Sequence, residues 1–292
     1  MESRQGEAND PTFESLCEKR VSFVFPTKNR AEYLASALER YRSLKGPDDE
    51  IIVVDGGSTD STRDVAERYK DVIDIFISEP DESGPNAINK GIVFARGRYT
   101  QLLTDDDKFF KEGIDHVVKV MDENPEIDLL VCGGTKEKDG RKMGSKYIPS
   151  GIPYGKHPED AFRYKAGAGL GLFTRRKSFA RMGQLMPCEQ YLTHLTDLAC
   201  VAAFIKKGGI VKFCRVRLYH HIIYQHGVSV KREGSGADRR VVREYCSYRF
   251  YLRYCMWRFL KEHQSWFGSL HSFIWKTVPK NVVESWDGGL SW

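Results

Sequence analysis

The sequence predicts an α/β protein with a mostly parallel sheet and helices on both faces of that sheet. Short segments of β-branched and other apolar residues alternate with segments whose apolar residues recur at helical spacing. This alternation is typical of parallel sheets, because a helix usually connects one parallel strand to the next. Polar clusters follow three of the expected strands, at the sheet edge where such folds bind their ligands.

The first expected strand covers residues 21–25 and stops at Pro26. A helix follows over residues 31–44 and ends at Gly46 and Pro47. Its apolar residues recur at helical spacing, which predicts one buried face. That face comprises Leu34, Ala37, Leu38 and Tyr41.

A second strand, rich in β-branched residues, covers residues 51–54. The turn at residues 55–60 is rich in residues that tolerate a positive φ or cap a helix, and a helix through Tyr69 follows it. The first half is completed by a strand at 72–77, a helix at 85–95 and a strand at 99–103.

The second half of the chain is less regular. We expect a strand at residues 127–132, a loop-rich excursion at 136–158 and a helix at 195–206 with one apolar face. A helical pattern returns over residues 239–263.

The composition is that of a soluble globular protein, with 41% hydrophobic and 29% charged residues. No apolar run approaches the roughly 20 residues of a membrane-spanning helix, and residues 1–20 lack the apolar core of a secretory signal. Seven cysteines without a CxxC pair argue against a zinc site and against a disulfide framework. We therefore expect a cytoplasmic protein with free thiols.

Basic and aromatic residues are concentrated at the end of the chain. Residues 231–292 hold eleven Lys and Arg against six Asp and Glu, which accounts for the whole net charge of +5. All five tryptophans of the chain lie there as well. Such a segment could lie on an anionic bilayer as an interfacial helix. Packing of its aromatic residues on the rest of the protein is slightly favoured, because polar and apolar residues do not separate cleanly by helical position.

The acidic run after the fourth strand is the most informative feature of the sequence. Asp105, Asp106 and Asp107 follow a largely apolar strand almost directly. Carboxylates at one strand edge repel one another, so their proximity favours a bound cation. A solvated acidic turn is the alternative. Two more polar clusters, at residues 27–30 and 55–60, are expected at the same edge of the sheet.

Four segments of the chain resemble family 2 glycosyltransferases with the GT-A fold, in the order and spacing of that family. They read VSFVFPTKNR, EIIVVDGGSTDST, SEPDESGPNAINKGIVFARGRY and LLTDDD. The resemblance covers residues 21–230. It implies an inverting transfer of a sugar from a nucleotide diphosphate donor, with Mn²⁺ or Mg²⁺ as cofactor, in polysaccharide biosynthesis. The habit of the family favours a UDP-sugar.

The resemblance makes the acidic run the metal site. Asp106 is the expected ligand, and Asp105 is placed near the ribose or the metal. Asp107 is the alternative ligand, because the family usually shows two carboxylates where this chain has three. A divalent cation held there would neutralise the charge that develops on the leaving diphosphate. His220, His221 and His226 could contribute a late metal ligand or contact the diphosphate, although isolated histidines are more often structural.

The resemblance also assigns residues that bind the donor. These are Pro26, Thr27, Asn29, Arg30, Asp55, Asn89, Lys90 and Asp105. Asp55 matches the position that hydrogen-bonds the base, and Lys90 could meet phosphate charge. Local roles are the alternative, since Asp55 and Asn29 could cap helices and Lys90 could be solvated. The residues after Gly84 depart from the aromatic and acidic pattern of the family, which leaves the sugar open.

An inverting transfer needs a base that takes the proton of the acceptor hydroxyl. Asp197 lies in a segment that resembles the family segment supplying this carboxylate. Spacing alone favours a plainer role, that of an acid in the first turn of a helix. The glycine-rich stretch at 167–171 lacks the lysine and the spacing of a phosphate loop. The resemblance instead implies that this stretch lies beside the acceptor, where its backbone can approach a sugar closely.

The sequence leaves two alternatives open, namely that the protein is a nucleotidyltransferase or that it is a non-catalytic sugar-binding module. A nucleotidyltransferase normally has a glycine-rich loop after its first strand, where this chain has residues 26–30, PTKNR. We expect an N-terminal extension (1–20), a GT-A domain (21–230) and a basic, aromatic helical segment (231–292). The expected partners are a nucleotide-sugar donor and a glycan or lipid-linked acceptor, without nucleic acid, and with peripheral contact to the inner face of a membrane as an option.

Overall fold

The computed structural model describes residues 17–146, 153–164, 169–182, 196–223 and 236–262. Within that part a nine-stranded sheet has the order β3-β2-β1-β4-β8-β6-β9-β5, and β7 pairs with β6. The strands are β1 (Lys19–Thr27), β2 (Glu50–Asp55), β3 (Ile75–Ser78), β4 (Gly97–Leu102), β5 (Lys108–Phe109), β6 (Leu129–Lys138), β7 (Arg141–Lys146), β8 (Leu172–Arg175) and β9 (Val211–Ile223).

The helices that accompany this sheet follow the alternation of the sequence. They are α1 (Ala31–Arg42), α2 (Thr62–Arg68), α3 (Gly84–Phe94), α4 (Lys111–Glu123), α5 (Glu159–Tyr164), the short 3₁₀ helix η2 (Gly169–Gly171), α6 (Ser178–Met182), α7 (Thr196–Lys206), α8 (Gly236–Tyr245) and α9 (Tyr248–Glu262). None of the helices in the described ranges is long and apolar enough to cross a membrane.

The predicted α/β architecture with a mostly parallel sheet is confirmed. β1 pairs in parallel with both β2 and β4, and β2 pairs in parallel with β3. β6 and β9 are also parallel to each other, whereas β5, β7 and β8 run antiparallel to their neighbours. The carboxyl ends of β1, β2 and β4 therefore lie at one edge, as expected for strands joined by helical crossovers.

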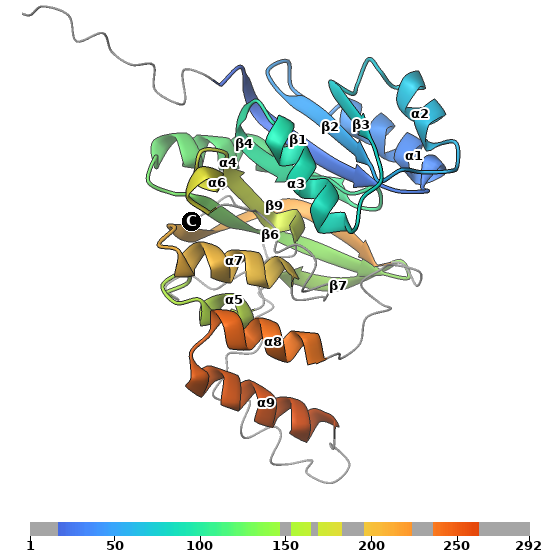
Figure 1. Ribbon diagram of the computed structural model, residues 1–292. Coiled ribbons are helices and arrows are strands. Elements are labelled where there is room, and N and C mark those ends of the chain that lie inside the picture. Colours follow the sequence, from blue (N-terminus) through green and yellow to red (C-terminus); the bar gives the residue numbers. More distant parts are fainter. Residues whose placement is uncertain (1–16, 147–152, 165–168, 183–195, 224–235, 263–292) are drawn as a thin grey trace, which may run out of the picture.

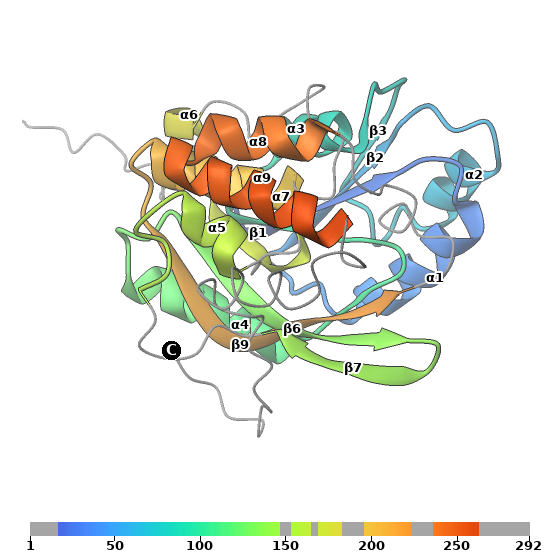
Figure 2. The same ribbon diagram turned by 90° about the horizontal axis from the view of Figure 1, so that it is seen from below.

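Two apolar layers cover the sheet, one on each face (Figures 1 and 2). The first contains the buried faces of α1, α2 and α4, with residues such as Leu34 and Val117 fully buried. The second contains Ile88 of α3 and the apolar side of α7, and α5, α8 and α9 pack beyond α7. The sheet is thus buried on both faces, which is why its central strands are almost continuously apolar.

The predicted elements of the first half are confirmed to within a few residues at their ends. One correction concerns Pro26, which does not end the first strand: β1 continues to Thr27. The prediction that a loop-rich region begins at residue 136 was also wrong. There β6 extends to Lys138 and forms a hairpin with β7, because backbone pairing with β7 and β9 holds a polar sequence in a strand. The single C-terminal helical pattern is two helices, α8 and α9.

Candidate active site

The three polar clusters predicted from the sequence meet at the carboxyl edge of the sheet. Thr27 at the end of β1 lies opposite Asp55 at the end of β2 in the parallel register. The backbone N–H of Leu103, just after β4, donates to the carbonyl of Val24 at 2.8 Å, which brings the acidic run beside the same edge. The fold itself therefore assembles one site from segments about 80 residues apart in the chain.

The loops after β1 and β2 are fastened to each other by Asn29. Its backbone N–H donates to the Ser58 hydroxyl at 2.7 Å, and its side-chain oxygen accepts from the N–H of Thr59 at 2.8 Å. Asn29 has a φ of 52°, in the left-handed region that asparagine tolerates better than most residues. The hydroxyl oxygen of Thr27 is buried and has no hydrogen-bond partner among the described residues, so the site holds a polar position for a further group.

Asp55 is fully buried and its carboxylate is already engaged by neighbouring residues. It accepts from the backbone N–H of Ser58 at 3.0 Å and from the Ser78 hydroxyl at 2.5 Å. The guanidinium of Arg63 lies 3.9 Å from the same carboxylate. The local, turn-organising role weighed for Asp55 is therefore present in the structure.

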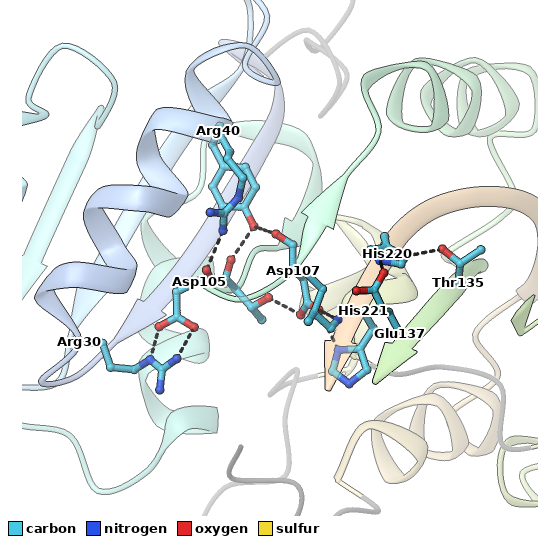
Figure 3. Close-up of polar contacts among 11 residues, drawn as sticks. Arg30, Arg40, Asp105, Asp107, Thr135, Glu137, His220 and His221 are labelled. Atoms are coloured by element: carbon cyan, nitrogen blue, oxygen red, sulfur yellow. Dashed lines mark hydrogen bonds and ion pairs between the residues drawn. The ribbon is translucent and has the colours of Figure 1, made fainter. Parts of the chain in front are cut away.

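The three carboxylates of the acidic run have three different surroundings, and Figure 3 shows those of Asp105 and Asp107. Asp105 receives two hydrogen bonds from the guanidinium of Arg30, one of them at 3.0 Å from Nη2. Arg40 also donates to the backbone carbonyl of Asp105 at 2.7 Å. Asp105 is therefore neutralised by a fixed cation, since a bidentate arginine is a strong partner for a carboxylate.

Asp107 is almost completely buried and belongs to a network with β9. Its carboxylate contacts His221 Nδ1 at 2.8 Å and accepts from the backbone N–H of Ile222 at 3.2 Å. It also accepts from the Thr104 hydroxyl in its own turn. These hydrogen bonds account for the burial of Asp107 and tie the acidic turn to β9.

Asp106 differs from its two neighbours. It makes no hydrogen bond or ion pair with another residue in the part of the chain that the structure describes. Burial raises the pKa of this carboxyl, and the nearby charges of Asp107 and Asp105 raise it further. The charge of Arg30 lowers this pKa, but Arg30 is already paired with Asp105. A carboxylate that is costly to ionise and has no ion pair of its own gains most from a bound cation.

The acidic run fits a Mg²⁺ or Mn²⁺ site in which the protein supplies only one or two of the ligands. Among the described residues no group of three His, Cys, Asp or Glu side chains is arranged to hold a metal ion. Mg²⁺ often binds through one or two carboxylates, with phosphate and water oxygens as its other ligands. Asp105 and Asp106 border an open cleft of about 380 Å³, which they share with Tyr33 and Arg40 of α1. Asp106 is therefore both unpaired and accessible from solvent.

Asp197 lies in the first turn of α7, close to the end of β4. The backbone N–H of Gly169 donates to its Oδ2 atom at 2.8 Å. A Cβ atom at Gly169 would lie 2.9 Å from Asp197 Oδ1 and 3.3 Å from Leu102, so the glycine permits this close approach. The structure thus brings Asp197 beside the strand that leads into the acidic run and gives the glycine-rich stretch a steric role.

The remaining expected residues lie at varying distances from this cluster. Lys90 of α3 is held by Glu79 at 2.8 Å and by the Pro80 carbonyl at 3.0 Å, and Asn89 precedes it on the same helix. Pro26 is part of β1. His220 contacts Thr135 at 2.7 Å and Glu137 at 3.2 Å (Figure 3). His226 lies outside the described residues.

Sequence reasoning missed Lys136 and the contact between His221 and Asp107. Lys136 lies opposite His221 in the register of β6 and β9, and burial lowers the pKa of its ammonium group while Asp107 opposes that shift. Within the described ranges the ammonium group of Lys136 makes no hydrogen bond or ion pair. No local signal could identify this lysine, because residues 136–138 do not form a strand pattern by themselves.

Comparison with known proteins agrees with this fold. The model of Glycosyl transferase family 2 matches residues 22–180, which is more than half of the chain. The chain therefore belongs to glycosyltransferase family 2. It is 31% identical over 194 residues to the putative teichuronic acid biosynthesis glycosyltransferase TuaG of Bacillus subtilis, covering 64% of this chain and 73% of that protein.

Two other relatives match shorter stretches. An uncharacterized glycosyltransferase of Rickettsia typhi is 29% identical over 140 residues, 48% of this chain and 44% of that protein. The GalNAc(5)-diNAcBac-PP-undecaprenol beta-1,3-glucosyltransferase of Campylobacter jejuni is 30% identical over 108 residues, 36% of this chain and 35% of the relative. The chain thus spans less than half of these two relatives.

Solved structures establish the GT-A fold. TarS (1–349) of S. aureus in complex with UDP-GlcNAc superposes with a TM-score of 0.59 at 17% identity, covering 85% of this chain and 73% of that one. The mannosyltransferase PcManGT of Pyrobaculum calidifontis, in complex with GDP-Man and Mn²⁺, gives a TM-score of 0.52 at 17% identity, covering 77% and 61%.

Proposed function

We propose that this protein is a metal-dependent, inverting glycosyltransferase that moves a sugar from a nucleoside diphosphate donor to a hydroxyl group of a glycan or lipid-linked acceptor. The observation that carries the proposal is the unpaired carboxylate of Asp106 at the carboxyl edge of the sheet. Its neighbours Asp105 and Asp107 are neutralised or fully hydrogen-bonded, so a divalent cation is the partner that Asp106 still lacks.

The donor would lie along the edge formed by the ends of β1, β2 and β4. The first loop would hold the nucleoside through Pro26, Thr27, Asn29 and Arg30, with Asp55 near the base, Asp105 near the ribose, and Asn89 and Lys90 on the phosphate side. The unpartnered hydroxyl of Thr27 supports this placement, because it offers a buried polar contact to a ligand. Lys136 adds a cation on the far side of the acidic run.

A divalent cation at Asp106 would supply charge neutralisation to the departing diphosphate. Asp107 stays the alternative ligand and His226 a candidate one, but the engagement of Asp107 with His221 favours Asp106. Mn²⁺ is proposed alongside Mg²⁺, and the Mn²⁺ in the PcManGT complex supports that choice. The UDP-GlcNAc in the TarS complex supports a UDP-sugar donor.

Asp197 would act as the base that accepts the proton of the acceptor hydroxyl. The hydrogen bond from Gly169 N–H fixes one carboxylate oxygen. This contact stabilises the ionised form that a base requires. A saccharide could approach the glycine-rich backbone closely, which suits an acceptor site there. The undecaprenol-linked substrate named for the C. jejuni relative supports a lipid-linked acceptor as one option.

The test is a transfer assay with a panel of nucleotide sugars in the presence of Mn²⁺ or Mg²⁺. We expect sugar transfer by the wild type. Asp197→Asn should lower transfer by about 10²–10⁴-fold, the typical contribution of a general base, while nucleotide binding is retained. The matched control is Glu112→Gln, an exposed acid in the first turn of α4 that does not line the cleft, which should leave transfer unchanged.

Three outcomes would contradict the proposal in different ways. Unaltered turnover of Asp197→Asn removes this residue as the base. Release of pyrophosphate in place of a nucleoside diphosphate identifies a nucleotidyltransferase. Sugar binding without turnover of any donor identifies a non-catalytic binding module.

A further inference from the structure

Helix α9 has one face packed on the protein and one face open to solvent. Tyr254 is only 9% exposed, and Phe250 and Tyr251 pack against the second apolar layer. On the other side, Tyr248 is 71% exposed and Leu252 is 48% exposed. Met256, one turn further along, is 45% exposed, so these three side chains form a continuous apolar row at i, i+4 and i+8.

A row of cations lies directly beside this apolar row. Arg249 and Arg253 each follow a member of the apolar row in the sequence, and both are exposed. Helix α9 contains four Lys and Arg and a single acid, Glu262, which is its last residue. Residues 248–256, which hold the exposed apolar and cationic side chains, include no Asp or Glu.

The position of α9 leaves this face accessible. Figures 1 and 2 show α9 at the rim of the molecule, with α8 beside it and α7 and the sheet further in. The buried residues on α8 and α9, such as Val242 and Tyr254, anchor the pair to the second apolar layer. The outer face of α9 is thus open to a partner, while its inner face packs on the protein.

We propose that this face of α9, made of Tyr248, Arg249, Leu252, Arg253 and Met256, binds the surface of an anionic lipid bilayer. Apolar and aromatic side chains enter the boundary between headgroups and acyl chains, while basic side chains pair with anionic headgroups. A second copy of the chain is a poorer partner, because a two-fold contact would bring the same arginines together. The proposal does not depend on the sugar-transfer activity.

The experiment is co-sedimentation of the full chain with phosphatidylcholine vesicles, with and without phosphatidylglycerol. We expect binding only to vesicles that contain phosphatidylglycerol, and weaker binding as the salt concentration rises. Arg249→Gln with Arg253→Gln should weaken binding by about 30-fold, the change expected for two basic side chains at a bilayer surface. Leu252→Glu with Met256→Glu should abolish binding.

The matched control is Val93→Glu with Phe94→Glu at the end of α3. These two residues are also exposed apolar side chains, at 80% and 52%, and the substitution changes the net charge by the same amount as either α9 variant. The control should bind vesicles as the wild type does, and all variants should show the wild-type thermal unfolding transition, since the replaced side chains are exposed.

Several results would overturn the proposal. One is no binding to either vesicle, and another is equal binding to neutral and anionic vesicles. A third is an equal loss of vesicle binding in the α3 and α9 variants. The last is a dimer that the α9 substitutions break, without any vesicle binding. Loss of sugar transfer without loss of vesicle binding would instead concern the active site alone.

Discussion

At the scale of single residues, the acidic run shows how three identical side chains acquire different roles. Asp105 is paired with Arg30, which lies 75 positions earlier in the chain, and Asp107 is paired with His221, which lies 114 positions later. Asp106 keeps no such partner among the described residues. The carboxylate available for a metal is therefore selected by tertiary contacts, because the local sequence gives all three residues similar neighbours.

This assignment predicts opposite effects of two adjacent substitutions on stability. Asp107→Asn should lower the free energy of unfolding by about 1.5–3 kcal/mol, because it removes charged hydrogen bonds in a buried network. Asp106→Asn should leave that free energy unchanged or raise it slightly, since it relieves repulsion within the run. Urea unfolding of the metal-free protein measures both changes. A larger loss for Asp106→Asn than for Asp107→Asn would argue that the two roles are reversed.

The sequence could predict which residues gather at this edge, and it could not predict how they pair. The four motifs place residues 27–30, 55–60 and 105–107 at the ends of parallel strands, and the structure brings those ends together. Lys136 and His221 enter the same region only through the pairing of β6 with β9. Such partners are set by long-range register, for which a single sequence carries no local signal.

At the scale of elements, α3 carries Asn89 and Lys90, the residues expected near the phosphates. The helix packs closely on β1 and β2. A Cβ atom at Gly91 would lie 2.5 Å from Val24 Cγ1 and 3.2 Å from Val54 Cγ2. Glycine at this position lets the helix approach the sheet closely, so it sets the distance between α3 and the sheet.

We predict that Gly91→Ala destabilises the protein by about 1–3 kcal/mol through overpacking. Gly84→Ala in the same helix is the matched control, because no atom lies within 4 Å of the Cβ position there. The control should unfold at the wild-type urea concentration or slightly above it, since alanine favours the helix. Equal midpoints for the two variants in urea unfolding would show that α3 can move away from the sheet at little cost.

Helices and strands could be predicted where the hydrophobic periodicity of the sequence agrees with the burial of the residues. They could not be predicted where pairing with a distant strand decides the structure. The first half alternates apolar strands with amphipathic helices, so its order could be read directly. β8 has only four residues, and β9 combines many charged residues with apolar ones. The pairing of β6 with β9 also contains a register irregularity next to Cys132, which a periodic pattern cannot anticipate.

At the scale of the whole molecule, the basic C-terminal helices are part of the packed structure. Val242 of α8 is fully buried in the second apolar layer, together with residues of α5 and α7. This agrees with the interpretation that aromatic residues of this segment pack on the rest of the protein, while the outer face of α9 stays open. The division of the chain at residues 20 and 230 stays a prediction.

The stability of the folded chain should decrease between pH 7 and pH 5 partly because of His116. Burial lowers the pKa of this imidazole below its usual 6.5, and its Nε2 atom has no hydrogen-bond partner among the described residues. The unfolded chain therefore binds a proton below about pH 6.5 that the folded chain resists, so stability falls as the pH falls through this window. Urea unfolding at pH 7, 6 and 5 should show a smaller decrease for His116→Gln. An equal decrease in both proteins would remove His116 from this explanation.

The central claim is that Asp106 holds a divalent cation against the diphosphate of a nucleotide donor. Calorimetric titration of UDP and of GDP, with and without Mn²⁺, tests it on the wild type and on Asp106→Asn. We predict that Mn²⁺ strengthens binding of at least one nucleotide to the wild type and has no such effect on Asp106→Asn. Mn²⁺-strengthened binding that persists in Asp106→Asn, or wild-type binding that ignores Mn²⁺, would contradict the claim.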